Sequence, residues 1–294
     1  MKLKRFQIAK PKVGLVLGSG AARGWSHIGV IKAFRDHQIP IHIITGTSAG
    51  AVVGAFLAAD AIENLERFTL SHKSLKDTFS YMDFTINNGG LVAGKKFMKF
   101  LEEHLPVRKF SELKIPFGVV ATDLITFSEI HIDDGFLIPA IRASVAVPGF
   151  LTPLESQGMQ LVDGGLVNPV PVNLARQLGA DIVISVDLNA HNANLKVKSF
   201  MGILDRTVSV LMNKVREANM EKFPADITIT PDLSHYKFMD YHKTNEAIQI
   251  GYDSAMEKIP EIKKILSNPI SKYKKAVLGN RALHLFVTSN KKKK

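Results

Sequence analysis

Short apolar runs alternate with longer amphipathic segments along most of the chain, and this alternation constrains the fold more than any other feature. The short runs predict strands at Val13–Leu17, Ile41–Thr45, Phe117–Thr122, Glu129–Ile132, Gln160–Val162, Asp181–Asp187 and Asp226–Thr230. The longer segments predict helices at Gly24–His37, Ala49–Ala59, Pro139–Ser144, Val170–Leu178, Ser199–Lys222 and Asn245–Leu266. Such a pattern is typical of a sheet with helices on its faces. Because the connections are short and no internal repeat is evident, the sequence predicts one α/β domain.

Residues 60–114 have a different composition from the rest of the chain. The amphipathic segments ENLERFTLSHKSLKDTF and AGKKFMKFLEEHL flank the loop NNGGLVAG. Large apolar side chains stand beside lysines there, at Phe68, Leu70, Leu75, Phe79, Tyr81, Met82 and Phe84. A helical layer packed on the sheet would explain this composition, and so would a lid or acyl-chain groove that contacts lipid. We expect a helical insertion and leave both interpretations open.

The net charge of +11 is concentrated at the C-terminus. Residues 256–294 contain 11 Lys and Arg against 2 Asp and Glu, whereas residues 1–255 contain 27 against 25. A segment this basic can contact anionic lipid headgroups or nucleic acid, or it can be a solvated tail. We therefore divide the chain into a basic N-terminal segment at 1–12, a catalytic domain at 13–255 and a basic C-terminal segment at 256–294.

Two features of the composition limit where the chain can function. The sequence has no cysteine, which excludes disulfides, a thiol nucleophile and thiolate metal sites. No apolar stretch reaches the about 18 residues that a membrane-spanning helix requires, and the apolar run at 13–17 is too short for a signal peptide. We expect a cytoplasmic protein that contacts the inner face of the membrane through its basic C-terminal segment.

A glycine-rich loop, LGSGAARGWSHIGV, follows the first predicted strand. Gly18, Gly20 and Gly24 permit a tight turn, and the helix after them offers free N–H groups and a positive dipole end to an anion. A dinucleotide site requires G-x-G-x-x-G and a later acidic residue, but Arg23 occupies the place of the third glycine and the next strand ends without Asp or Glu. Backbone donors for an oxyanion are therefore the stronger interpretation, and a nucleotide-binding module is the weaker one.

The stretch GTSAG, residues 46–50, lies between a predicted strand and a predicted helix. G-x-S-x-G in this context is the pattern of a nucleophile elbow, in which Gly46 and Gly50 make room for a strained turn at Ser48. A serine nucleophile needs a base. The downstream histidines, at 191, 235, 242 and 284, lie in no context that stands out, and His27 is expected to pack on a helix face.

An aspartate offers an alternative base. A short predicted strand ends in Asp163, and Gly164 and Gly165 follow it. Asp-Gly is a common turn pair, so a structural role is one interpretation. The second glycine would also let the backbone approach another loop while the carboxylate points toward it. A buried, desolvated aspartate hydrogen-bonded to the serine could act as the base.

The motifs GSGAARG, GTSAG and DGG occur in this order, and with them the sequence resembles the patatin-like phospholipase family, particularly its single-domain bacterial members. The resemblance extends through VVATDL, AIRASVAVPGFLTP and VDGGLVNPVPVNLARQLGADIVISVDL and covers residues 12–190. It implies a three-layer α/β/α patatin-like fold, lipid acyl esters as substrates and a Ser–Asp dyad without histidine.

The same resemblance assigns roles to individual residues. It implies that Ser48 is the nucleophile, that Asp163 is the base and that the backbone N–H groups of residues 19–21 form the oxyanion hole, namely those of Ser19, Gly20 and Ala21. Supporting positions are Gly18, Arg23, Gly24, Gly46, Gly50, Gly164 and Gly165. The family loop usually reads G-G-G-x-R-G, so this chain departs from it at Ser19 and Ala21. The departure bears on the width of the hole and the rate.

We therefore predict a phospholipase A- or lysophospholipase-like serine esterase that requires neither a metal nor an organic cofactor. Two alternatives remain at this point: a lipid transacylase, and a regulatory protein with weak or vestigial esterase activity. The expected partners are a lipid or lysophospholipid substrate and an anionic membrane surface. No specific nucleic acid is expected.

Overall fold

The computed structural model describes residues 10–71, 74, 76–77, 83, 85, 90–191, 200–237 and 239–267. The chain forms two compact units, Met1–Glu257 and Lys258–Lys294. In the second unit the described residues are 258–267. Several predictions lie outside the described residues: those for segment 1–9, for the basic residues after 267, for His284, and for Leu75, Phe79, Tyr81, Met82 and Phe84.

An eight-stranded sheet forms the centre of the first unit, in the order β10-β9-β1-β2-β4-β8-β7, with β5 also paired to β4. The parallel strands are β1 (Val13–Leu17), β2 (Ile43–Thr47), β4 (Phe117–Asp123), β9 (Ile182–Val186) and β10 (Ile227–Ile229). The antiparallel strands are β5 (Ser128–Ile132), β7 (Leu154–Ser156) and β8 (Met159–Asp163). Two short strands, β3 (Gly90–Val92) and β6 (Gly149–Leu151), form a separate parallel pair.

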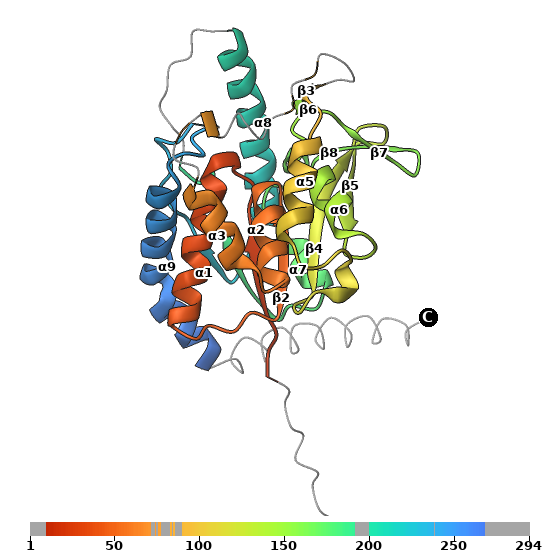
Figure 1. Cartoon of the computed structure of the whole chain (residues 1–294). Coiled ribbons are helices and arrows are strands. Elements are labelled where there is room, and N and C mark those ends of the chain that lie inside the picture. The colour runs from red at the N-terminus through yellow and green to blue at the C-terminus, as the bar shows by residue number, and fades with distance from the viewer. Residues whose placement is uncertain are drawn as a thin grey trace, which may run out of the picture. The chain divides into compact units, whose positions relative to one another are not determined.

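Helices cover both faces of this sheet (Figure 1). The helices that the structure describes are α1 (Ser26–Asp36), α2 (Ala49–Ala58), α3 (Ile62–Ser71), α5 (Lys95–His104), α6 (Leu137–Ser144), α7 (Val172–Gln177), α8 (Phe200–Lys222) and α9 (Thr244–Ser267). Ile44 faces α2, whereas its neighbour Ile43 packs with Val172 and Ala175 of α7. Because successive side chains of a strand point to opposite faces, α2 and α7 lie on opposite sides of the sheet. The predicted three-layer α/β/α architecture is confirmed.

The described part of residues 60–114 packs its helices through aromatic rings. The ring of Phe100 in α5 lies 4.1 Å from that of Phe68 in α3 and 6.0 Å from that of Phe56 in α2, measured between centroids. Phe56 and Phe100 are buried. These contacts make α3 and α5 a layer on α2. A lid or acyl-groove role for this segment stays a prediction.

The structure differs from the predicted elements at several places. β2 begins and ends two residues later than expected. Before the strand, the His42 N–H donates to Val13 O. Near its end, Gly46 is still paired with Leu17 of β1 and Val119 of β4. The predicted helix from Gly24 is preceded by a 3₁₀ turn, Ala21–Trp25. The strands β3, β6 and β7 were not predicted, since three residues are too few to show periodicity.

The register of β4 brings two distant segments together. β2 pairs with β4 up to Thr47 opposite Val120, and β8 pairs with the next residue, Ala121, through Asp163. Because β5 pairs with residues 119–123 along the other edge of β4, β2 and β8 share one edge and meet end to end. The residue after Thr47 is Ser48. The fold therefore places Ser48 beside Asp163, at the carboxyl ends of β1 and β2, where open α/β sheets commonly bind ligands.

Candidate active site

Ser48 occupies a strained turn between β2 and α2. Its backbone has φ 56° and ψ −119°, a conformation that side-chain-bearing residues rarely adopt. A Cβ at Gly50 would overlap the carbonyl oxygen of Leu17, and one at Gly46 would overlap the backbone of Gly50. Both flanking glycines are therefore required by close backbone approach. This is the local geometry of a nucleophile elbow, in which strain holds a hydroxyl in a fixed direction.

The Ser48 hydroxyl donates a hydrogen bond to the carboxylate of Asp163. The distance from Ser48 Oγ to Asp163 Oδ2 is 2.6 Å. The Ser48 backbone N–H donates to the Ser144 hydroxyl of α6 at 2.9 Å, which fixes the elbow from the other side. Ser48 is 7% exposed and Asp163 is 3% exposed. The two side chains thus form a nearly dry pair with a short path for proton transfer.

Asp163 is held in place from both ends. Gly165 N–H donates to its Oδ1 at 2.7 Å, and the Thr122 hydroxyl donates to its backbone oxygen at 2.8 Å. Burial raises the pKa of Asp163 to about 6, although the hydrogen bonds from Ser48 and Gly165 lower it. A carboxylate with this pKa is ionised at neutral pH and is a better proton acceptor than a solvated aspartate.

No histidine among the described residues is hydrogen-bonded to Ser48. His27 is fully buried, and its Nε2–H donates to the Gly18 carbonyl at 2.8 Å. Burial lowers the pKa of His27 to about 4, so the ring is neutral and holds the glycine-rich loop. His191 Nε2 lies 3.3 Å from Thr230 O, and His235 pairs with Glu246. The described geometry therefore leaves Asp163 as the base candidate.

The glycine-rich loop runs beside this pair, and the structure corrects one of its three predicted oxyanion donors. Ser19 N–H already donates to Pro169 O at 2.9 Å, because the loop packs on the segment that follows Asp163. The N–H groups of Gly20 and Ala21 form no hydrogen bond with any residue that the structure describes. They remain candidates for the hole.

Ala21 carries a conformational cost in this loop. Its φ of 49° lies in the left-handed region, which costs an alanine about 1–2 kcal/mol. The family pattern has glycine at this position. We expect Ala21→Gly to raise the free energy of unfolding by about 0.5–1 kcal/mol, after the extra entropy of glycine in the unfolded chain is subtracted. Urea denaturation measures this change. The control is Ala22→Gly, a buried 3₁₀ residue with no positive φ, which should be destabilised instead.

Asn189, which sequence reasoning missed, supports the loop together with the predicted Arg23. Asn189 donates from its side-chain amide to Ser19 O at 2.9 Å and accepts a hydrogen bond from Arg23 at 2.9 Å. Arg23 also donates to Tyr236 O, so this arginine ties the loop to the segment before α9. Asn189 follows β9 and belongs to no motif, so only its place beside Ser19 reveals its role.

Two further polar groups lie close to the dyad. The Ser19 hydroxyl is buried, has no partner among the described residues and lies near Gly165. Burial raises the pKa of Tyr241, and the nearby Asp163 carboxylate raises it further, so the phenol stays protonated. Sequence reasoning did not single out either side chain.

Within the described part of the chain, no group of His, Cys, Asp and Glu side chains is arranged to hold a metal ion. No helix in that part is long and apolar enough to cross a membrane.

Comparison with known proteins places this geometry in a family context. The family description "Patatin-like phospholipase" matches residues 15–176. An uncharacterized NTE family protein of Mycobacterium tuberculosis is 38% identical over 187 residues, which cover 63% of this chain and 51% of that protein. The chain thus spans about half the length of this relative.

Two further similarities are more distant. The human patatin-like phospholipase domain-containing protein 6 is 28% identical over 270 residues, covering 82% of this chain and 20% of that protein. The crystal structure of VipD from Legionella pneumophila matches with a TM-score of 0.49 and 13% identity, over 86% of this chain and 67% of that one.

Proposed function

Because the chain belongs to the patatin-like phospholipase family, we propose that it is a serine hydrolase that cleaves lipid acyl esters through a Ser48–Asp163 dyad. The observation that carries the proposal is the 2.6 Å hydrogen bond from Ser48 Oγ to Asp163 Oδ2 at a strained strand–helix turn. A buried serine needs no such strain and no desolvated carboxylate for packing alone. Both features are instead what an activated nucleophile requires.

In the first half of the reaction, Ser48 Oγ attacks the ester carbonyl carbon while its proton passes to Asp163 Oδ2. The carbonyl oxygen becomes an oxyanion, which the N–H groups of Gly20 and Ala21 stabilise. The loss of one such donor typically lowers the rate on the order of 100-fold or more. The C–O bond to the alcohol then breaks, and the alcohol leaves with the proton from Asp163. An acyl group remains on Ser48.

In the second half, a water molecule gives its proton to Asp163 and attacks the acyl carbon. The tetrahedral intermediate collapses, the fatty acid leaves, and Ser48 Oγ regains the proton. In each half of the reaction, the Asp163 carboxylate therefore first accepts a proton and then returns it. A lipid alcohol in place of water would give transacylation by the same steps.

The dyad predicts a simple pH dependence. Because burial raises the pKa of Asp163 to about 6 and only the ionised form accepts a proton, kcat/KM should rise with pH, reach half of its maximum near pH 6 and stay level through pH 8. The measurement is the hydrolysis of a soluble short-chain ester across this range. A second ionisation near pH 6–7 that disappears on replacing a histidine would contradict a histidine-free mechanism.

A direct test of the reaction uses lysophosphatidylcholine and a monoacylglycerol with the same acyl chain. We expect the purified protein to release fatty acid from at least one of them. An added acceptor lipid with product analysis by mass spectrometry separates hydrolysis from transacylation. If wild-type protein releases no acyl group from any lipid or short-chain ester, the chain is not an acyl hydrolase and a regulatory role becomes the better account.

The basic C-terminal segment, 256–294, suggests that the protein binds its substrate at a membrane surface. We infer that residues 13–255 carry the catalysis and that this segment recruits them to an anionic membrane surface, giving a cytoplasmic protein peripheral at the inner face of the membrane. This segment has 11 basic residues and only 2 acidic ones, which supports the inference. Co-sedimentation with vesicles should increase with anionic lipid content and decrease when residues after 279 are deleted. Binding that changes neither with the anionic lipid content nor with this deletion would contradict recruitment by charge.

A further inference from the structure

The peptide unit between Ser19 and Gly20 is held at one of its two ends. Its carbonyl oxygen, that of Ser19, accepts a hydrogen bond from Asn189 Nδ2 at 2.9 Å. Its N–H, that of Gly20, forms no hydrogen bond with any residue that the structure describes. Among the described residues no peptide bond is cis, and in a trans peptide unit the C=O and N–H groups point in opposite directions. Asn189 therefore turns the Gly20 N–H to the side of the loop that faces away from Asn189.

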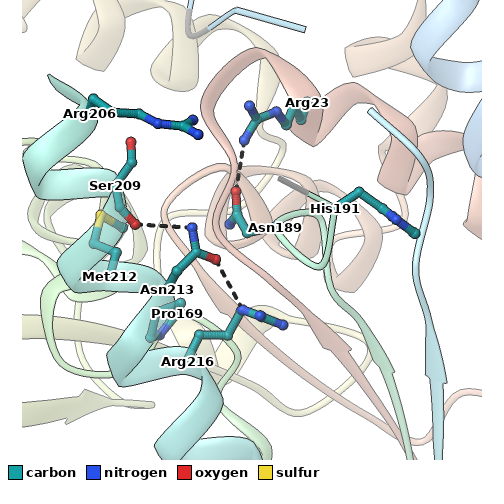
Figure 2. A pocket seen from close by; sticks show the side chains of 9 residues that line it. All are labelled: Arg23, Pro169, Asn189, His191, Arg206, Ser209, Met212, Asn213 and Arg216. Atoms are coloured by element: carbon teal, nitrogen blue, oxygen red, sulfur yellow. Dashed lines mark hydrogen bonds between the residues drawn. The ribbon is translucent and has the colours of Figure 1, made fainter. Parts of the chain in front are cut away.

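The Asn189 side chain is fixed at both of its polar ends. An arginine only donates hydrogen bonds and a backbone carbonyl only accepts them, so Oδ1 must face Arg23 and Nδ2 must face Ser19 O. Figure 2 shows the Arg23–Asn189 hydrogen bond in a polar pocket that both residues line together with α8. An aspartate in place of Asn189 would keep the bond to Arg23 and lose the bond to Ser19.

The Asn189 backbone is fixed as well. Its N–H donates to Asp187 Oδ1 at 3.1 Å, and Asp187 Oδ2 forms an ion pair with Arg216 of α8 at 2.5 Å. Asp187 is 1% exposed, and Arg216 compensates its charge in this dry position. A buried ion pair therefore determines the position from which Asn189 reaches the glycine-rich loop.

The unbonded N–H of Gly20 belongs to a part of the loop that a substrate can reach. Gly20 is partly exposed, whereas Ser19 before it is 2% exposed. The loop lies against the first turn of α2, because a Cβ at Gly24 would be 2.4 Å from the Cβ of Ala49, the residue after Ser48. The loop that presents this donor therefore adjoins the nucleophile.

From these contacts we propose that Asn189 is a positioning residue of the oxyanion hole. Its side-chain amide holds the Ser19 carbonyl and thereby directs the Gly20 N–H at the oxyanion that forms when Ser48 attacks an ester. The inference rests on the proposed function, because it assigns the residue that sets the geometry of that same site. Asn189 acts through the peptide unit, which has to be fixed in advance, since a donor that must reorient during the reaction stabilises the oxyanion less.

The test uses two variants of Asn189 and a matched control. Asn189→Asp keeps the shape of the side chain but repels the Ser19 carbonyl oxygen, and Asn189→Ala removes the donor without adding charge. The control is Asn213→Asp, which adds the same charge to the same pocket. The Asn213 side chain is hydrogen-bonded to Ser209 O and to Arg216 within α8.

The first measurement is steady-state hydrolysis of a soluble short-chain ester at pH 8. We expect kcat to fall about 100-fold in N189D and at least about tenfold in N189A, with KM within about twofold of wild type. Acylation and deacylation both pass through an oxyanion, so kcat should fall whichever half of the reaction is slower. N213D should keep both constants within about twofold of wild type. Circular dichroism confirms that each variant is folded at the assay temperature.

The second measurement uses a reversible inhibitor that forms the oxyanion itself. A trifluoromethyl ketone with the acyl chain of the substrate adds to the Ser48 hydroxyl and gives a tetrahedral adduct. Its inhibition constant should rise in N189D and in N189A by the same factor by which kcat/KM falls. A residue that only stabilised the fold would leave the inhibition constant of the folded enzyme unchanged.

The kinetic outcomes separate the positioning role from the reaction. If wild type hydrolyses the ester and both Asn189 variants keep kcat within about threefold of wild type, the positioning role is wrong and the hydrolase stands. A loss in N189D alone, with N189A at the wild-type rate, would assign the effect to charge and overturn the inference. A rise in KM without a change in kcat would assign it to substrate binding, with the same consequence.

A structural measurement does not depend on turnover. In crystals of N189D we expect the peptide unit between Ser19 and Gly20 to be rotated relative to wild type, so that the Gly20 N–H leaves its original direction. An unchanged peptide unit would overturn the inference even if the enzyme is active. If wild type hydrolyses no ester but the peptide unit is rotated in N189D, the proposed function fails and Asn189 stands as the residue that directs this N–H.

Discussion

Replacement of Ser48 with alanine is expected to lower kcat/KM for lipid ester hydrolysis on the order of 10⁴-fold or more. The change removes the attacking oxygen and leaves the Gly20 and Ala21 N–H groups in place, so only the residual effect of oxyanion stabilisation and binding remains. Fatty acid release from lysophosphatidylcholine, followed at pH 8 where Asp163 is ionised, measures the loss.

The Ser48→Ala protein should keep the wild-type fold. Alanine retains the Cβ, so the turn with φ 56° is neither relieved nor made worse, and the backbone N–H can still donate to Ser144. A suitable control is Ser71→Ala, which removes a serine hydroxyl that donates to the preceding helical turn and should leave turnover at the wild-type level. Turnover within about tenfold of wild type in purified S48A would exclude Ser48 as the nucleophile.

Asp163→Asn is expected to lower activity by a similar factor, on the order of 10⁴-fold, while making the protein more stable at neutral pH. Asparagine has the same shape and can still accept the Gly165 N–H bond. Its amide nitrogen faces Ser48 and cannot take the proton. Kinetic and unfolding measurements on the same sample show both effects, which separates loss of the base from loss of the fold.

The stability change follows from the direction of the pKa shift. Burial raises the pKa of Asp163 from 3.8 to about 6, so the folded protein disfavours the ionised form. Stability is therefore lost as pH rises from about 4 through 6, by about 3 kcal/mol for a shift of this size. The asparagine side chain of the variant never ionises. The variant should be more stable than wild type by about 1–3 kcal/mol at pH 8, and this difference should vanish toward pH 4.

An opposite outcome would be informative. Equal pH dependence of unfolding in wild type and in the Asp163→Asn protein would mean that Asp163 is not the desolvated carboxylate that the dyad requires. A catalytic site that is less stable than its inactive variant is expected when strain and desolvation serve function.

Much of the site can be predicted because its chemistry demands unusual local sequence. Glycines flank Ser48 where a Cβ would overlap the backbone, and glycines follow Asp163 where the chain passes close to β4. These local requirements select glycine at fixed positions, so they can be recognised in the sequence without knowledge of the rest of the fold. The α/β alternation is equally readable, because buried strands and amphipathic helices have different periods.

The juxtaposition of the two residues could not be predicted from the residues themselves. It depends on pairing along one edge of β4: the last residue of β2 pairs with Val120 of β4, and Asp163 of β8 pairs with the next residue of β4, Ala121. No local sequence pattern encodes that register. Asn189 and Ser144 were missed for a related reason, since the side chain of each is hydrogen-bonded to a backbone atom that is distant in the sequence. Ser19 was assigned as an oxyanion donor because sequence cannot show that Pro169 already accepts its N–H.

Covalent labelling tests the central claim most directly, because it reports on the reactivity of one hydroxyl. Wild-type protein is treated with a fluorophosphonate that carries a lipid-like chain, and the modified residue is located by mass spectrometry. The dyad predicts one adduct per chain, at Ser48, with a labelling rate that rises through pH 6 and is lost in Asp163→Asn. Stoichiometric labelling at another residue, or lipid hydrolysis that continues while Ser48 stays unlabelled, would contradict the account.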